Sequence, residues 1–125
     1  MGLFSRKPKE EKESNGIPWI ELKSVQQFHD IYNTPSDKLK VFFKHSTRCS
    51  ISSMALRNFQ AEWNINNDCA ELYFLDLIAF RDISNEIAAV TGVAHQSPQA
   101  IVLKDKQVKY HESHSHIDAV EIQKL

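Results

Sequence analysis

Cys49 is the residue of this chain best placed to act as a nucleophile. It lies between a short, mostly apolar segment, residues 39–43, and an amphipathic segment that begins at Ser50. Such a junction puts the sulfur at the start of a helix, where free N–H groups and a partial positive charge stabilise an anion. The thiolate is the reactive form of cysteine, and the nearby basic residues His45 and Arg48 also favour it. The position therefore predicts a nucleophilic thiol.

A buried and inert cysteine is the alternative interpretation, because free cysteines are often interior. The polar neighbours Arg48 and Ser50 favour the reactive one. Ser52 stands where a dithiol site would carry its second thiol. Its hydroxyl could donate to the Cys49 sulfur across the first helical turn, or it could be an ordinary first-turn residue. Without a thiol at position 52, Cys49 cannot release itself from a mixed disulfide by attack within the motif.

Ser97 and Pro98 directly precede a later apolar segment, residues 99–103. A cis bond before Pro98 would leave the neighbouring backbone free to pair with an extended thiol substrate. A trans proline at the start of a strand is commoner in proteins, and the sequence pattern by itself leaves both open. His95, two residues before Ser97, could face the same site.

The second cysteine, Cys69, comes after the helix that begins near Cys49. A helix of about fifteen residues carries the chain roughly 20 Å, and a disulfide requires Cα atoms within about 7 Å. We therefore expect Cys69 to be structural and to lie at the opposite edge of the sheet. The alternative, in which Cys69 resolves a mixed disulfide at Cys49, requires local unfolding.

Three histidines, His111, His114 and His116, raise the question of a metal site. They straddle a predicted strand end and helix start, and no carboxylate or thiol completes the set, so a solvated turn is favoured and no metal is expected. The two cysteines lack the C-x-x-C spacing of a zinc knuckle or a dithiol site, and they cannot supply a disulfide framework.

Apolar periodicity predicts strands that alternate with helices. The predicted strands are residues 18–22, 39–43, 72–75, 99–103 and 107–112, and the predicted helices are residues 25–32, 50–63, 83–90 and 115–124. In the helix after Cys49, we expect a buried face made of Ile51, Met54, Ala55, Phe59 and Trp63. The order βαβαβαββα favours an α/β fold, a mixed central sheet with helices on both faces.

Composition narrows the class of protein. The 125 residues are enough for one domain, which we expect at 17–125, after a mobile charged tail at 1–16. With 42% hydrophobic and 25% charged residues and a net charge of −1, nothing suggests binding to nucleic acid or to a membrane. The N-terminus shows no export signal, so we expect a cytoplasmic protein with reduced thiols, and a monomer.

The two motifs resemble those of the monothiol bacilliredoxins, a family with the thioredoxin-like fold. The resemblance covers Ile17 to the C-terminus and rests on Ser46-Thr47-Arg48-Cys49-Ser50-Ile51-Ser52 and His95-Gln96-Ser97-Pro98-Gln99. The family pattern has proline directly after the cysteine, where this chain has Ser50.

The resemblance implies a thiol–disulfide oxidoreductase in which the Cys49 thiolate takes bacillithiol from mixed disulfides on client proteins. A low-molecular-weight thiol or a partner reductase would regenerate it, so bacillithiol is a co-substrate and no tightly bound cofactor is implied. It also implies a cis Pro98. The residues implied in substrate binding are Thr47, Arg48, Ser52, Ser97 and Pro98.

Two other functions compete with this one. A peroxiredoxin-like thiol peroxidase is suggested by Ser46-x-x-Cys49, although Phe42 replaces the proline expected four residues before Ser46. A non-enzymatic thioredoxin-like stress or adaptor domain would use Cys49 only as a redox-sensitive contact. Peroxide consumption and partner binding by a Cys49→Ser variant separate these functions from thiol exchange.

Overall fold

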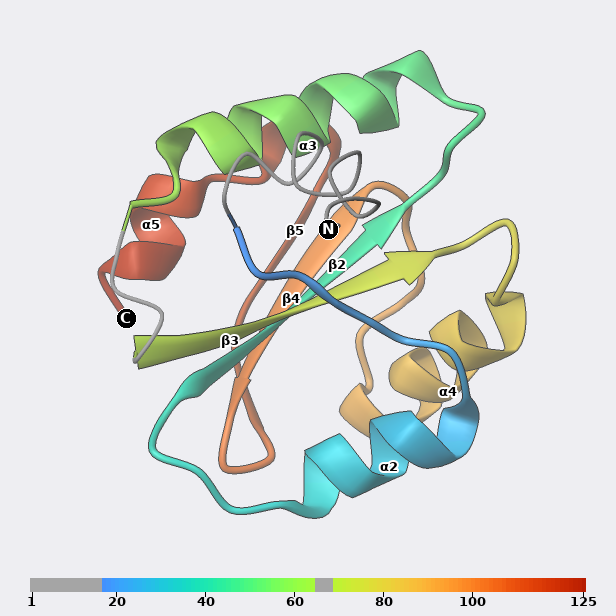
Figure 1. Ribbon diagram of the computed structural model, residues 1–125, viewed down its shortest axis with the longest axis vertical. Helices are drawn as coiled ribbons and strands as arrows, with labels where there is room; N and C mark the ends of the chain where they lie inside the picture. The colour runs from blue at the N-terminus through green and yellow to red at the C-terminus, as the bar shows by residue number, and fades with distance from the viewer. Residues whose placement is uncertain (1–16, 65–68) are drawn as a thin grey trace, which may run out of the picture.

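A computed structural model describes residues 17–64 and 69–125; the predicted tail at 1–16 lies outside this range (Figure 1). Its five strands form one sheet in the order β1-β3-β2-β4-β5, in which β1, β3 and β2 are parallel and β4 and β5 are antiparallel. The elements are β1 (Ile20–Glu21), α2 (Val25–Asn33), β2 (Leu39–His45), α3 (Ser50–Glu62), β3 (Ala70–Asp76), α4 (Arg81–Thr91), β4 (Gln99–Lys104), β5 (Gln107–Ser113), a 3₁₀ turn η2 (His114–His116) and α5 (Ala119–Gln123). This order confirms the predicted α/β class and the mixed sheet.

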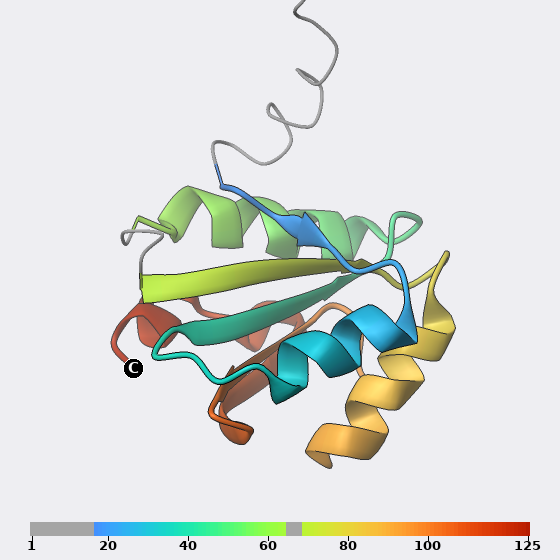
Figure 2. The same cartoon turned by 60° about the horizontal axis from the view of Figure 1, so that its bottom comes forward.

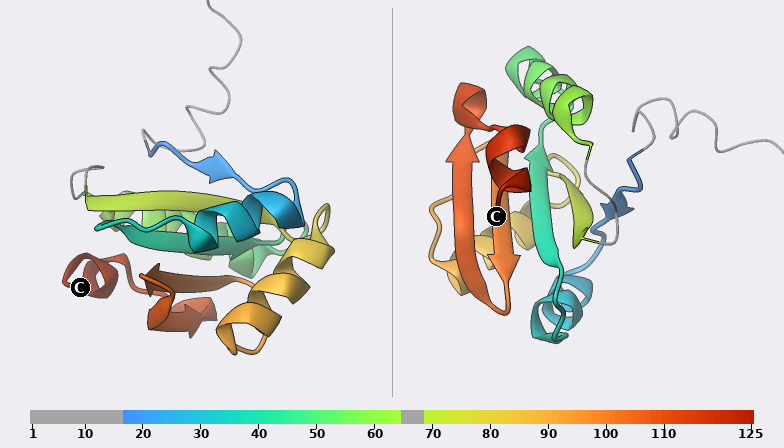
Figure 3. Two further views of the ribbon diagram at one scale, coloured as in Figure 1. Left: turned by 90° about the horizontal axis from the view of Figure 1, so that it is seen from below. Right: turned by 90° about the vertical axis from the view of Figure 1, so that its left-hand side faces the viewer.

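The sheet lies between two layers of helices. Figure 2 shows α3 above the sheet and α2 and α4 below it, and the right-hand view of Figure 3 shows the strands running from β5 to β1. On the α3 side, Val41 and Phe43 of β2 pack against Phe59 of α3 and Ile122 of α5. The helices therefore cover both faces of the sheet. Because β2 and β3 are parallel, their carboxyl ends, at His45 and Asp76, lie at the same edge of the sheet.

The second core lies on the other face, between the sheet and α2 and α4. Phe42 of β2 stacks on Tyr73 at 5.1 Å between ring centroids and packs against Phe28 of α2 at 5.6 Å. Ile83 and Ile87 of α4 complete this core and are fully buried. Because alternate residues of β2 enter the two cores, every residue of the strand is buried, including the polar ones.

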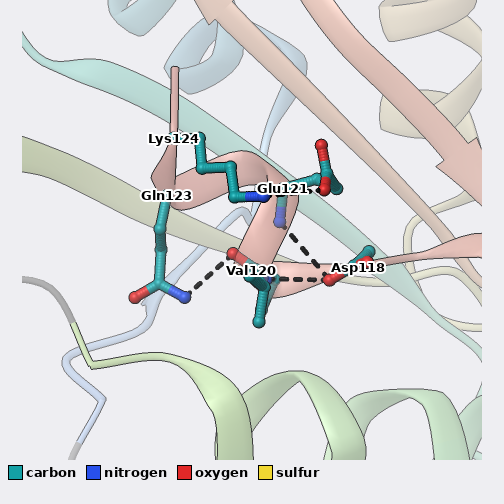
Figure 4. Close-up of polar contacts among 6 residues, drawn as sticks. Asp118, Val120, Glu121, Gln123 and Lys124 are labelled. Atoms are coloured by element: carbon teal, nitrogen blue, oxygen red, sulfur yellow. Dashed lines mark hydrogen bonds and ion pairs between the residues drawn. The ribbon is translucent and has the colours of Figure 1, made fainter.

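Local signals in the sequence fix several helix ends. Ser24 accepts a hydrogen bond from the Gln27 N–H at 3.0 Å and starts α2. Gly92 ends α4 with φ of 78°, a left-handed conformation that favours glycine. Asp118 starts α5 because its Oδ1 accepts hydrogen bonds from the Val120 and Glu121 N–H groups (Figure 4).

The buried face of α3 differs from the prediction. Ile51 and Met54 were expected in the core, but their side chains are 57% and 56% exposed. The helix instead buries Ser52 and Gln60 together with Phe59. These two polar side chains find hydrogen-bond partners on the sheet side, and the apolar pattern alone did not show that.

The C-terminal helix is also shorter than predicted. The segment predicted as one helix, 115–124, is divided into the 3₁₀ turn at His114–His116 and the five-residue α5. Asp118 lies between them with an extended backbone. Its side chain accepts hydrogen bonds from the first turn of α5, so a helix begins anew there and does not continue from residue 115.

Candidate active site

Cys49 is the N-cap residue of α3, as the sequence predicts. Its backbone is extended (φ −115°, ψ 121°), and its carbonyl accepts the first hydrogen bond of the helix, from the Ser53 N–H at 3.1 Å. The thiol is free and partly exposed. The sulfur therefore stands at the end of a 13-residue helix whose N–H groups in the first turn lack carbonyl partners within the helix.

The turn before Cys49 is held by hydrogen bonds at both of its ends. The Cys49 N–H donates to the Ser46 carbonyl at 3.2 Å, and the Ser46 N–H donates to Ser52 Oγ at 3.0 Å. Ser52 Oγ also lies 2.7 Å from Nδ1 of His45, the last residue of β2. Within the described residues, no hydrogen bond joins Ser52 to the Cys49 sulfur.

The remaining predicted site residues lie at the same edge of the sheet. Thr47 and Arg48 are exposed in the turn before Cys49. The Ser97–Pro98 bond is cis, and it precedes β4, whose first residue Gln99 pairs with Lys44 of β2. The loop after β2 and the segment before β4 are therefore neighbours at the carboxyl edge of the sheet. Ser52 is fully buried, so its side chain lies behind the surface that a substrate would meet.

Side chains on the α4 side of the sheet hold the segment before β4, residues 94–98, which is called the Pro98 segment. Gln99 Nε2 donates to the Ala94 carbonyl at 3.0 Å, and Ser97 Oγ is buried with no hydrogen-bond partner among residues 17–64 and 69–125. His95 Nδ1 lies 2.8 Å from Oγ of the buried Ser84 of α4, so its ring is tied to that helix.

Lys44 is a residue that the sequence reasoning missed. It is fully buried on the α4 side of β2, and its Nζ has no hydrogen-bond partner in the described part of the chain. Burial lowers the pKa of Lys44 to about 8. Burial first, and then the charges of Lys44 and Arg81, lower the pKa of His95. An apolar run interrupted by a lysine was the available signal, but lysine is normally taken as exposed.

Cys69 is exposed and lies far from Cys49. It directly precedes β3, at the edge where β2 begins, because Leu39 pairs with Ala70. Seven residues of strand separate that edge from the one near Cys49, which is roughly 20 Å at the usual rise per residue. The two thiols are free and stand at opposite edges of the sheet, as predicted.

The described residues hold no group of three or more His, Cys, Asp or Glu side chains able to bind a metal ion. His111, His114 and His116 are exposed on β5 and the following 3₁₀ turn. In the same residues, no helix has the length and apolar character needed to cross a membrane.

Comparison with known proteins agrees with this geometry. The family model of the monothiol bacilliredoxin BrxC matches residues 20–122. The chain belongs to the monothiol bacilliredoxin family. Bacilliredoxin membership and the fold together show a thiol redox protein, a thiol–disulfide oxidoreductase in general.

Solved structures similar to this bacilliredoxin share the thioredoxin fold. One is described as a candidate oxidoreductase with a thioredoxin fold; it is 28% identical, with a TM-score of 0.73 over 89% of this chain and 95% of that one. Thioredoxin from Malassezia sympodialis is 22% identical, with a TM-score of 0.60 over 83% and 84% of the two chains. Mitochondrial thioredoxin 3 from Saccharomyces cerevisiae is 16% identical, with a TM-score of 0.61 over 90% and 94%.

Proposed function

We propose that this bacilliredoxin removes bacillithiol from mixed disulfides on client proteins, with Cys49 as nucleophile and acceptor. One observation carries the proposal: Cys49, at the N-cap position of α3, has a free and partly exposed thiol, and the other cysteine lies at the opposite edge of the sheet. The thiolate is the form of cysteine that attacks a disulfide. Family membership supports bacillithiol as the small thiol.

The chemistry is two successive thiol–disulfide exchanges. The Cys49 thiolate attacks the bacillithiol sulfur of the mixed disulfide, an S–S bond forms between them, and the client sulfur leaves as a thiolate that takes a proton from water. A second low-molecular-weight thiolate, or the thiolate of a partner reductase, then attacks the bacillithiol sulfur and frees Cys49. Each step breaks one S–S bond and forms another, so the proposal needs no tightly bound cofactor.

The substrate would lie along the edge shared by the Cys49 turn and the Pro98 segment. Thr47 and Arg48 offer exposed polar groups on one side of the sulfur, and Ser97, held by its cis bond to Pro98, offers backbone on the other. The proposal involves client proteins and a small thiol but no second subunit, and it places the reaction in the cytosol, where both cysteines stay reduced.

Intact-protein mass spectrometry tests the proposal. The reduced protein is incubated with oxidised bacillithiol and, separately, with glutathione disulfide. We expect a bacillithiol adduct that forms faster than the glutathione adduct, persists in Cys69→Ser and is absent from Cys49→Ser. A Cys49→Ser protein that still exchanges thiols contradicts the assignment of the nucleophile.

The same variants distinguish the two competing functions. Rapid peroxide consumption that requires Cys49, without exchange of bacillithiol, indicates a thiol peroxidase. Unchanged partner binding by Cys49→Ser, with no exchange by the wild-type protein, indicates a non-enzymatic adaptor.

A further inference from the structure

We infer that His45 is a positioning residue for the Cys49 thiol, acting through Ser52. The inference rests on the proposed role of Cys49 as the nucleophile, but it concerns how the chain holds that sulfur. Neither His45 nor Ser52 is exposed enough to meet a substrate, since their side chains are 6% and 0% exposed.

The Ser52 hydroxyl contacts two groups at once. A serine hydroxyl has one hydrogen to donate and two lone pairs that accept. One lone pair accepts the Ser46 N–H at 3.0 Å, and the contact of 2.7 Å with His45 Nδ1 uses either the hydrogen or the second lone pair. In both tautomers of His45, the serine hydroxyl links the imidazole ring to the Ser46 backbone.

Ser46 connects the Ser52 hydroxyl to the backbone of Cys49. The Ser46 carbonyl accepts the Cys49 N–H at 3.2 Å, so the Ser46 residue is bonded to Ser52 on one side and to Cys49 on the other. The Cys49 side chain makes no capping hydrogen bond of its own with the described residues. The place of the sulfur therefore depends on the backbone turn at 46–49, which the His45–Ser52 pair holds.

His45 is itself held in place by contacts with neighbouring residues. Its carbonyl accepts the Leu77 N–H at 2.8 Å, and its ring packs on Phe74 of β3 with 5.5 Å between the centroids. The backbone of His45 is thereby held at the end of β2, and its ring is packed against β3. Because position 50 is a serine and not a proline, the first helical residue does not constrain the turn, which leaves the side-chain pair to do so.

The test compares variants of His45 and Ser52 in a Cys69→Ser background, where iodoacetamide reports only Cys49. The amide oxygen and nitrogen of asparagine lie at the same number of bonds from Cα as Nδ1 of histidine, whereas those of glutamine lie one bond farther. We expect His45→Gln and Ser52→Ala to slow alkylation of native Cys49 roughly three- to tenfold, the range that corresponds to one buried hydrogen bond. We expect His45→Asn to stay within about twofold of the parent.

Gln60→Met is the matched control on the same helix. It removes a partly buried hydrogen bond of α3, in which Trp19 Nε1 donates to Gln60 Oε1 at 2.8 Å. This variant should lower the midpoint of urea unfolding as Ser52→Ala does, and it should leave the alkylation rate unchanged.

Two results overturn the inference. One is that Ser52→Ala alkylates like the parent although its unfolding midpoint falls, which is the behaviour of a merely structural bond. The other is that His45→Asn is slowed as much as Ser52→Ala. Should His45→Gln fail to fold, Ser52→Ala and His45→Asn still decide the matter. Alkylation needs no bacillithiol, so a wild-type protein that shows the expected alkylation pattern but no exchange refutes the proposed function and leaves the positioning role standing.

Discussion

Replacing Lys44 by methionine should stabilise the protein at neutral pH. The Lys44 side chain is fully buried in β2, and within the described residues its Nζ has no hydrogen-bond partner. Desolvation by burial lowers its pKa from 10.5 to about 8. A charged ammonium group in such a place costs free energy that an apolar side chain of similar length does not.

The size and sign of the effect follow from the pKa. One pKa unit corresponds to about 1.4 kcal/mol, so the fall from 10.5 to about 8 amounts to about 3 kcal/mol of lost stability at pH 7. The unfolded chain binds the proton more tightly than the folded one. The full cost is therefore present below about pH 8, and it disappears as the pH rises toward 10.5. We expect Lys44→Met to gain about 1–4 kcal/mol at pH 7, and less at pH 10.

Urea unfolding of both proteins at pH 7 and pH 10 measures this. Lys40→Met is the matched control, because Lys40 is the other buried lysine of β2, but its Nζ donates to the Ile31 and Thr34 carbonyls at the end of α2. That variant should lose stability. The reasoning about Lys44 is refuted if Lys44→Met is less stable at pH 7, or if its advantage is equally large at pH 10.

Three further predictions concern single backbone positions. Ser50→Pro should raise the free energy of unfolding by about 0.4–1 kcal/mol. Ser50 is the first residue of α3, and the ψ of 121° at Cys49 suits a following proline. An unchanged or lower urea midpoint contradicts this. Gly92→Ala should lower the free energy of unfolding by about 1–2 kcal/mol, because the φ of 78° strains an alanine backbone even though a Cβ there meets no atom within 4 Å. A thermal melt that matches the wild type would be the opposing result. Asp118→Ala should lose about 1 kcal/mol with the cap of α5, whereas Asp118→Asn should keep most of it in the same melt.

The predictable part of the fold came from signals that act locally. Ser24 and Gly92 mark helix ends through their own hydrogen bonding and backbone freedom, and the helices that they bound contain the predicted ranges 25–32 and 83–90. The place of Cys49 at the start of α3 was predictable for the same reason, since an apolar strand meets a helical pattern there.

The parts that escaped prediction depend on polar side chains inside the protein. Ile51 and Met54 fitted the apolar stripe of α3, but Ser52 and Gln60 take the inward positions because His45 and Trp19 bond to them. Periodicity counts apolar residues and does not register a serine that is satisfied in the core. Lys44 escaped because the predicted strand ended at residue 43, whereas β2 runs to His45, and because lysine is normally taken as exposed.

The distance between Cys49 and Cys69 bears on how the protein returns to its starting state. In the folded molecule Cys69 lies too far away to attack an adduct at Cys49, so under the proposed function the lifetime of the adduct is set by collisions with another thiol. That lifetime lengthens when the supply of reducing thiol runs low, and under the proposed function the loaded fraction of the protein follows the redox state of the cell.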